Sequence, residues 1–128
     1  MSSRVVHFEI PFDDGDRARN FYAEAFGWQV QPMPGMDYTL VLSGPSGDAG
    51  PTEAGFINGG MHDRSSAPAS GPTIAVDVES IDDTLQTVAK LGGATVVGKT
   101  PVGEMGFTAY VRDPEGNVIG LWETARQG

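Results

Sequence analysis

An internal repeat constrains the fold of this chain more than any other feature of its sequence. Residues 5–30 and residues 72–96 each contain an alternating apolar strand, an acidic turn, a helix, a glycine and a further strand. Asp16 in the first copy aligns with Asp82 in the second. The repeat predicts an α+β fold of two βαβββ modules, because each copy is followed by further short strand patterns.

The first copy shows how local patterns define each element. Val6, Phe8 and Ile10 alternate with His7 and Glu9, so the strand has one apolar face and one mixed face. We expect Pro11 and the acidic residues that follow it to end this strand, and Asp14 or Asp16 to cap the next helix. The pattern predicts strands at 4–10, 28–30, 38–42 and 56–61, with a helix that ends at Gly27.

The second half repeats this order of elements. It predicts a helix over 81–91 and strands at 73–78, 94–97, 107–111 and 118–123. A chain of 128 residues fits one domain. We therefore expect a single domain over residues 1–128, with module one at 4–62, a linker at 63–72 and module two at 73–124.

Composition excludes several classes of partner. The formal net charge is −9 and the sequence has no basic stripe, so we expect no binding to nucleic acid. No apolar run is long enough to span a bilayer, and because no charged segment followed by an apolar run opens the chain, we expect no signal peptide. The chain has no cysteine, which excludes disulfides and thiolate metal sites. We expect an acidic cytoplasmic protein, and a homodimer because half-open sheets leave edges that need pairing.

The two copies differ at one chemically important position. His7 of the first strand aligns with Thr73 in the second copy. Glu9 shares the face of His7, since side chains two positions apart on a strand point the same way. His7 has three interpretations: a metal ligand, a metal-free binding residue that titrates near neutral pH, or a lining residue with no chemical role.

A set of motifs carries a family resemblance across nearly the whole chain. They are His7 within VHFEI, Phe21-Tyr22 followed by Phe26-Gly27-Trp28, Asn58-Gly-Gly60, and the terminal DPEGN strand over 113–122. With these motifs the chain resembles the vicinal oxygen chelate superfamily, which includes glyoxalase I, bleomycin-resistance proteins and extradiol dioxygenases. The nearest likeness is to its small, single-domain glyoxalase-like members.

The resemblance implies that each module curls its sheet and that the two modules form a cup. In metal-dependent members of the family, the first and fourth strands of each module supply the ligands. The matching positions here are His7, a residue near Asn58 to Gly60, Thr73 and Gly120. Threonine is a poor ligand and glycine has no side chain, so we expect no metal cofactor and a degenerate metal site. His62 could join His7 if the register of the fourth strand shifts.

The leading hypothesis is therefore a protein that binds a small organic ligand, cationic or aromatic, in a cup without a divalent metal. Gly120 leaves space where metal enzymes of the family carry glutamate, and Trp122 shares its face. His7 and Glu9 are also the candidate catalytic residues. The expected ligand-binding residues are His7, Glu9, Tyr38, Asn58, Thr73, Phe107, Gly120 and Trp122.

Three alternatives remain open at this point. The chain could be a metal-dependent lyase, isomerase or dioxygenase that uses His7 with unusual donors such as His62 or Glu123. It could be a metal-free enzyme with His7 or Glu9 as the base, or a partner-binding module with a vestigial cup. Alternation points Glu123 away from the cup, which counts against the first. Gly59-Gly60 indicates a close backbone approach or a bulge.

Overall fold

A computed structural model of the chain describes residues 3–35 and 38–125. These residues form two compact units, residues 7–72 and residues 73–125 together with 3–6. Each unit is built around one strand–helix–three-strand module, so the predicted α+β class with two βαβββ modules is confirmed. Residues 63–72, expected to be a linker, are grouped with the first unit.

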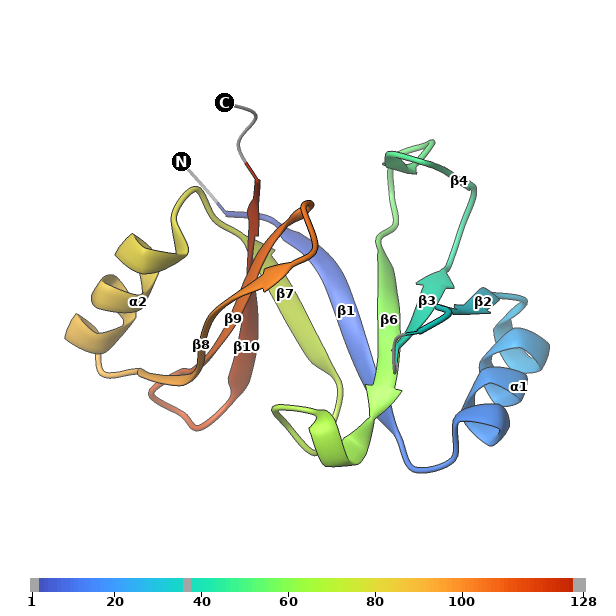
Figure 1. Cartoon of the computed structure of the whole chain (residues 1–128), viewed down its shortest axis with the longest axis horizontal. Coiled ribbons are helices and arrows are strands. Elements are labelled where there is room, and N and C mark those ends of the chain that lie inside the picture. Colours follow the sequence, from blue (N-terminus) through green and yellow to red (C-terminus); the bar gives the residue numbers. More distant parts are fainter. Residues whose placement is uncertain (1–2, 36–37, 126–128) are drawn as a thin grey trace. The chain divides into compact units, whose positions relative to one another are not determined.

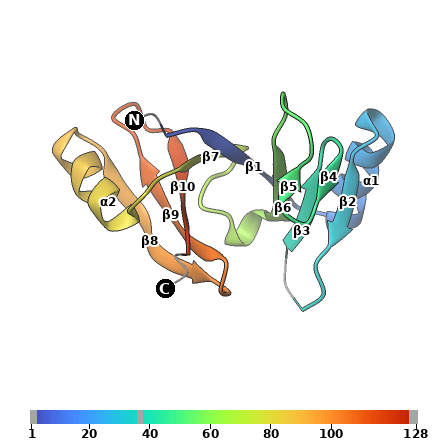
Figure 2. The same cartoon turned by 90° about the horizontal axis from the view of Figure 1, so that it is seen from above.

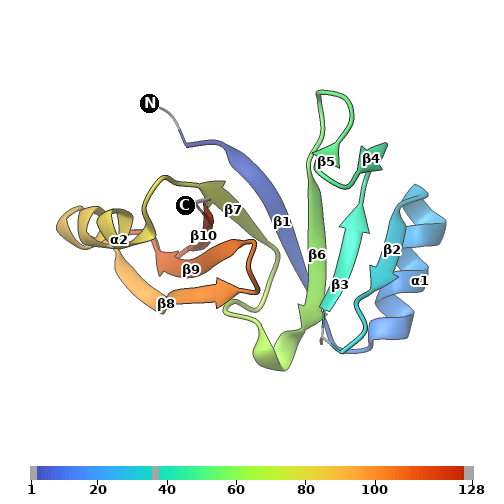
Figure 3. The ribbon, with the colours of Figure 1, turned by 45° about the horizontal axis from the view of Figure 1, so that its top comes forward.

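The sheet of the first unit has the strand order β2-β3-β6-β1 (Figure 3). β1 and β6 run parallel, whereas β3 is antiparallel to both β6 and β2. The first and fourth long strands of the module are therefore direct neighbours. The elements that build the unit are β1 (Val5–Phe12), α1 (Gly15–Phe26), β2 (Gln29–Pro32), β3 (Tyr38–Leu42) and β6 (Asn58–Asp63).

β1 is longer than the sequence pattern predicts. Pairing with β6 continues through Pro11 and Phe12, which lie opposite His62 and Asp63. The prediction that Pro11 ends the strand was wrong, since proline's fixed φ is compatible with extended backbone and Pro11 is buried against a partner strand. β6 likewise begins and ends two residues later than the predicted strand at 56–61.

Helix α1 packs on one face of this sheet (Figure 2). The side chain of Asp14 accepts a hydrogen bond from the backbone N–H of Arg17 at 3.1 Å, and Gly27 ends the helix in the left-handed conformation. Tyr22 of the helix stacks on Trp28, with ring centroids 5.4 Å apart. The buried centre of this layer consists of Phe12, Val41 and Met61, of which Val41 and Met61 are fully buried.

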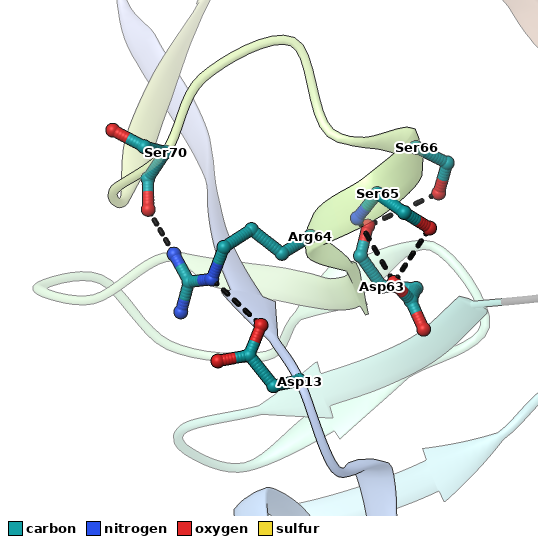
Figure 4. A network of polar contacts seen from close by, with 6 residues as sticks. All are labelled: Asp13, Asp63, Arg64, Ser65, Ser66 and Ser70. Atoms are coloured by element: carbon teal, nitrogen blue, oxygen red, sulfur yellow. Dashed lines mark hydrogen bonds and ion pairs between the residues drawn. The ribbon is translucent and has the colours of Figure 1, made fainter.

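Two connections of the first unit have structure of their own. The loop at 43–55 contains a small hairpin, β4 (Ser46–Gly47) and β5 (Gly50–Pro51). After β6, a short 3-10 helix, η1 (Arg64–Ser66), is capped by Asp63. The Arg64 guanidinium donates to Asp13 at 3.0 Å and to the carbonyl oxygen of Ser70 (Figure 4). This network attaches the segment to the end of β1.

The second unit repeats the arrangement with the strand order β7-β10-β9-β8, and α2 packs on one face (Figure 1). β7 and β10 are parallel, and the other pairs are antiparallel. Its core consists of Ile81, Ala109, Val111 and Leu121. The elements are β7 (Thr73–Asp77), α2 (Ile81–Lys90), β8 (Ala94–Val102), β9 (Gly106–Arg112) and β10 (Val118–Thr124).

The strand predicted at 94–97 extends in the structure to Val102. β8 shifts its register against β9 between Thr95 and Val97 and again between Val97 and Thr100. Such irregularities break the strict alternation that marks a strand, which explains why the sequence pattern indicated a shorter one. Within the described residues, no helix is both long and apolar enough to cross a bilayer.

Candidate functional site

The candidate site lies on the face of the first sheet opposite α1. Alternation places Phe8 and Ile10 of β1 against the helix layer, so His7 and Glu9 point to the other face. Strand pairing sets His7 opposite Asn58, Glu9 opposite Gly60, and Tyr38 opposite His62. Three neighbouring strands thus bring two histidines, a carboxylate and a phenol onto one face. We call His7, Glu9, Tyr38 and His62 the polar cluster.

Tyr38 and His7 are joined by a hydrogen bond across the strand between them. The Tyr38 hydroxyl oxygen lies 3.0 Å from Nε2 of His7, although β6 separates β3 from β1. The path crosses Gly60, where an added Cβ would overlap the hydroxyl oxygen of Tyr38. The predicted close approach at Gly59-Gly60 is confirmed, since a Cβ at Gly59 would also overlap Phe8.

Burial determines the protonation states of His7 and Tyr38 near neutral pH. Burial lowers the pKa of His7; the nearby charge of Glu9 opposes that shift and His62 adds to it. Burial, followed by the negative charge of Glu9, raises the pKa of Tyr38 far above its usual value. Near neutral pH the pair therefore consists of a neutral imidazole and a protonated phenol, so Tyr38 donates and His7 Nε2 accepts.

Glu9 is the most deeply placed charged group of the polar cluster, with 8% of its surface exposed. Its charge acts on both His7 and Tyr38. Tyr38 also contacts His62 edge to face, with ring centroids 6.4 Å apart. The cluster is thus a half-buried polar surface that combines a carboxylate with a phenol and two imidazole rings, a chemistry suited to a cationic ligand.

Asn58, a predicted ligand-binding residue, has a structural task in the loop that follows β3. Its amide oxygen accepts from the Ser43 backbone N–H at 3.0 Å, and its Nδ2 donates to Ser46 Oγ at 2.8 Å. The side chain therefore holds the 43–55 loop against the start of β6. It lies beside His7 in register, but its hydrogen-bonding groups are used by the loop.

The other predicted residues lie in the second unit. Thr73 is buried, and Gly120 lies opposite Tyr110 in the β9–β10 pair. Trp122 shares the face of Gly120, covers Gly106, and donates from its indole nitrogen to Thr124 at 3.1 Å. Around Gly120 the room is limited, because an added Cβ would come within 3.2 Å of the Tyr110 ring.

Phe107 is placed with the helix layer of the second unit. It packs against the α2-side core, and the Lys99 ammonium lies 4.5 Å from its ring centroid. Tyr110, three positions later, lies on the opposite face with Gly120. Strand alternation alone does not show which of these two aromatic residues shares the face of Gly120. The structure places Tyr110 on that face, whereas Phe107, the residue predicted to bind ligand, packs on the α2 side.

The strand pairing also fixes the ligand positions that the family resemblance implies. In the first unit, Gly60 pairs with Glu9, which lies two residues after His7. In the second unit, Gly120 pairs with Ala75, which lies two residues after Thr73. Both fourth-strand positions are therefore glycine, and His7 is the one strong donor of the four. Its Nε2 already accepts a hydrogen bond from Tyr38.

These residues do not fit a divalent metal. Such ions take three or more protein or water donors, and protein sites normally supply three or four. Among residues 3–35 and 38–125, no group of three or more histidine, aspartate or glutamate side chains is arranged to hold one. Glu123 is engaged elsewhere: Oε1 accepts from the Ile81 N–H at 2.7 Å, which confirms that this side chain points to the α2 face.

Comparison with known proteins confirms the resemblance inferred from the motifs. Residues 4–44 match the family described as bleomycin resistance protein-like N-terminal. A mycobacterial relative, which carries the provisional name glyoxylase CFP32 in Mycobacterium bovis, is 27% identical over 123 residues. The match covers 92% of this chain but 44% of that protein, so the chain spans less than half the length of this relative.

Solved structures share the fold. A glyoxalase/bleomycin resistance protein/dioxygenase superfamily member from Vibrio splendidus has a TM-score of 0.61 and 16% identity, covering 96% of this chain and 99% of that one. Methylmalonyl-CoA epimerase from Mycobacterium tuberculosis has a TM-score of 0.60 and 19% identity, covering 95% and 88%. The chain has the fold of the glyoxalase, bleomycin-resistance and dioxygenase superfamily.

Proposed function

We propose that this chain binds a small organic cation on the face formed by the polar cluster, without a divalent metal. The observation that carries the proposal is the Tyr38–His7 hydrogen bond across Gly60. In this arrangement the Tyr38 hydroxyl is bonded to Nε2 of His7, and the Tyr38 ring fills the space over Gly60 that the side chain of a fourth-strand metal ligand would need. The same face carries the almost fully buried carboxylate of Glu9 beside aromatic rings, and this combination of negative charge and aromatic surface suits a protonated amine.

The fold also supports this assignment. The family matched by residues 4–44 is named for resistance to bleomycin, a cationic drug. A protein that sequesters such a molecule needs a charged, partly aromatic surface and no reacting group. The acidic chain, with a formal net charge of −9, would also attract a cation over distance.

Thermal unfolding in the presence of bleomycin and a panel of small amines tests the proposal. With chelator present throughout, a ligand at one hundred times its Kd should stabilise the folded protein by about 2.7 kcal/mol. We expect Glu9→Gln to weaken binding about tenfold or more, because a hydrogen bond to a charged group is lost. Glu115→Gln in the exposed turn after β9 is the matched control. Equal binding by both variants would refute the role of Glu9.

A second candidate function is an enzyme of the lyase, isomerase or dioxygenase type. The shifted pKa values of His7 and Tyr38 favour it, since perturbed groups cluster at catalytic sites. A metal-dependent version would need His7 with His62, which share the face and interact electrostatically. Turnover that is abolished by chelator and by His7→Ala would establish this alternative over simple binding.

We propose further that the protein acts in the cytoplasm as a homodimer. β8 stands at one end of its sheet order and β2 at one end of the other, so each sheet offers an edge for pairing. Light scattering coupled to gel filtration tests the oligomeric state. A monomer at micromolar concentration would contradict the dimer without bearing on ligand binding.

A further inference from the structure

Tyr38 reaches His7 only because position 60 has no side chain. Neighbouring strands lie about 4.8 Å apart, so residues two strands away are too distant for most side chains to meet. The long Tyr38 side chain covers this gap by lying over Gly60 on β6, where a Cβ would overlap its hydroxyl oxygen. Tyr38 and Gly60 therefore form a matched pair.

The direction of the hydrogen bond follows from the protonation of the two groups. A protonated phenol beside a neutral imidazole donates its proton, and Nε2 of His7 accepts it at 3.0 Å. The proton of the neutral ring then resides on Nδ1. Once its own proton is used, the Tyr38 oxygen has only lone pairs to offer, and Glu9 adds carboxylate oxygens to the same face.

We infer that Tyr38 determines the specificity of the proposed site: its bond to His7 closes Nε2 to metal ions and leaves the Tyr38 oxygen as an acceptor near the Glu9 carboxylate, which favours ligands with a protonated nitrogen. This inference rests on the proposed function and adds the residue responsible and the class of ligand. Tyr38 contacts the ligand through its oxygen and acts on His7 as a positioning residue. Among the described residues of β1, β3 and β6, the other charged or titratable groups that alternate onto this face are Glu9 on β1 and His62 on β6.

The tautomer of His7 tests the positioning role directly. In ¹⁵N-resolved NMR spectra of the full chain, we expect Nδ1 to carry the proton and Nε2 to show the shift of an acceptor. Tyr38→Phe removes only the hydroxyl and should shift the neutral His7 ring toward the tautomer that is protonated at Nε2. Gly60→Ala should do the same by displacing the ring. Tyr22→Phe, a hydroxyl loss on the α1 side, is the matched control.

Two results would overturn this role. One is an Nε2–H tautomer in the wild-type protein. The other is a His7 spectrum that Tyr38→Phe leaves unchanged. A Zn²⁺ titration gives an independent reading: the His7 signals should respond at lower Zn²⁺ concentration in Tyr38→Phe than in the wild type. An equal response in both proteins would show that the Tyr38 hydrogen bond does not block metal binding at Nε2 of His7.

A pair of probes tests the ligand class. Benzamidine is cationic at neutral pH and benzamide is its neutral isostere. We expect benzamidine to perturb the Tyr38 and His7 signals, benzamide to have no effect at the same concentration, and Tyr38→Phe to bind benzamidine about tenfold more weakly. Equal binding of both probes, or no binding of benzamidine, overturns the inference. The bleomycin and amine panel above reports separately on the proposed function.

Discussion

The hydroxyl oxygen of Tyr38 lies 3.0 Å from Nε2 of His7, although a whole strand separates β3 from β1. This contact links the local sequence to the chemistry of the site. A glycine at position 60 permits it, burial keeps the imidazole neutral, and the phenol occupies the nitrogen that a metal would need. The contact therefore stands at the position where the family resemblance implies a metal ligand.

Substitution of Gly60 by alanine should destabilise the protein. The new Cβ would overlap the Tyr38 hydroxyl, and side-chain overpacking of this kind costs about 1–3 kcal/mol. Urea unfolding at neutral pH measures the loss. Gly98→Ala is a suitable control, because a Cβ at that position in β8 meets nothing within 4 Å. Equal stabilities for both variants would contradict the prediction, because they would mean that the Tyr38 side chain is not held firmly over Gly60.

The lowered pKa of His7 predicts a pH-dependent stability. The unfolded chain binds a proton at the ordinary value of 6.5, whereas the folded chain resists it. The contribution of His7 is therefore fully present above pH 6.5 and is lost as the pH falls through the lowered folded pKa.

Urea unfolding of wild type and His7→Gln between pH 8 and pH 5 measures this contribution, since the variant lacks the titrating group. We expect the stability of the wild type to fall more steeply below pH 6.5 than that of His7→Gln. Parallel curves for the two proteins would contradict the burial of a neutral His7. The lowered pKa values of Asp63 and Asp113 act at more acidic pH and do not overlap this window.

Parts of this architecture could be predicted from the sequence and parts could not. The repeat predicted both modules, because alternation, caps and terminal glycines agree in each copy. The register of β6 could not be predicted, since Asn58-Gly-Gly60 has no apolar alternation to fix it. Tyr38 was a predicted site residue, but its bond to His7 depends on that register.

For the second unit, the sequence also could not predict which aromatic residue of β9 faces the helix. Phe107 and Tyr110 lie three positions apart on one strand and so point to opposite faces. Nothing local in the sequence indicates which of them faces α2. The packing of Phe107 with the helix layer and the pairing of Tyr110 with Gly120 decide it.

Glu123 should contribute to stability through helix α2. Its carboxylate accepts from the Ile81 N–H at 2.7 Å and lies 3.7 Å from the Lys99 ammonium. Glu123→Ala leaves the helix end with an unsatisfied donor, and we expect a loss of about 1 kcal/mol, typical of a lost cap. Thermal unfolding measures it, with Glu115→Ala as the exposed control. If Glu123 instead bound a metal, the loss would appear only in protein that contains the ion.

The metal content of the native protein tests the central claim most directly. Elemental analysis of the wild type and of His7→Ala, both purified without chelator, gives the equivalents of divalent metal per chain. We predict far less than one equivalent in the wild type and no change in the variant. One equivalent per chain that disappears with His7→Ala would contradict the account, because the Tyr38–His7 bond would then not close the site.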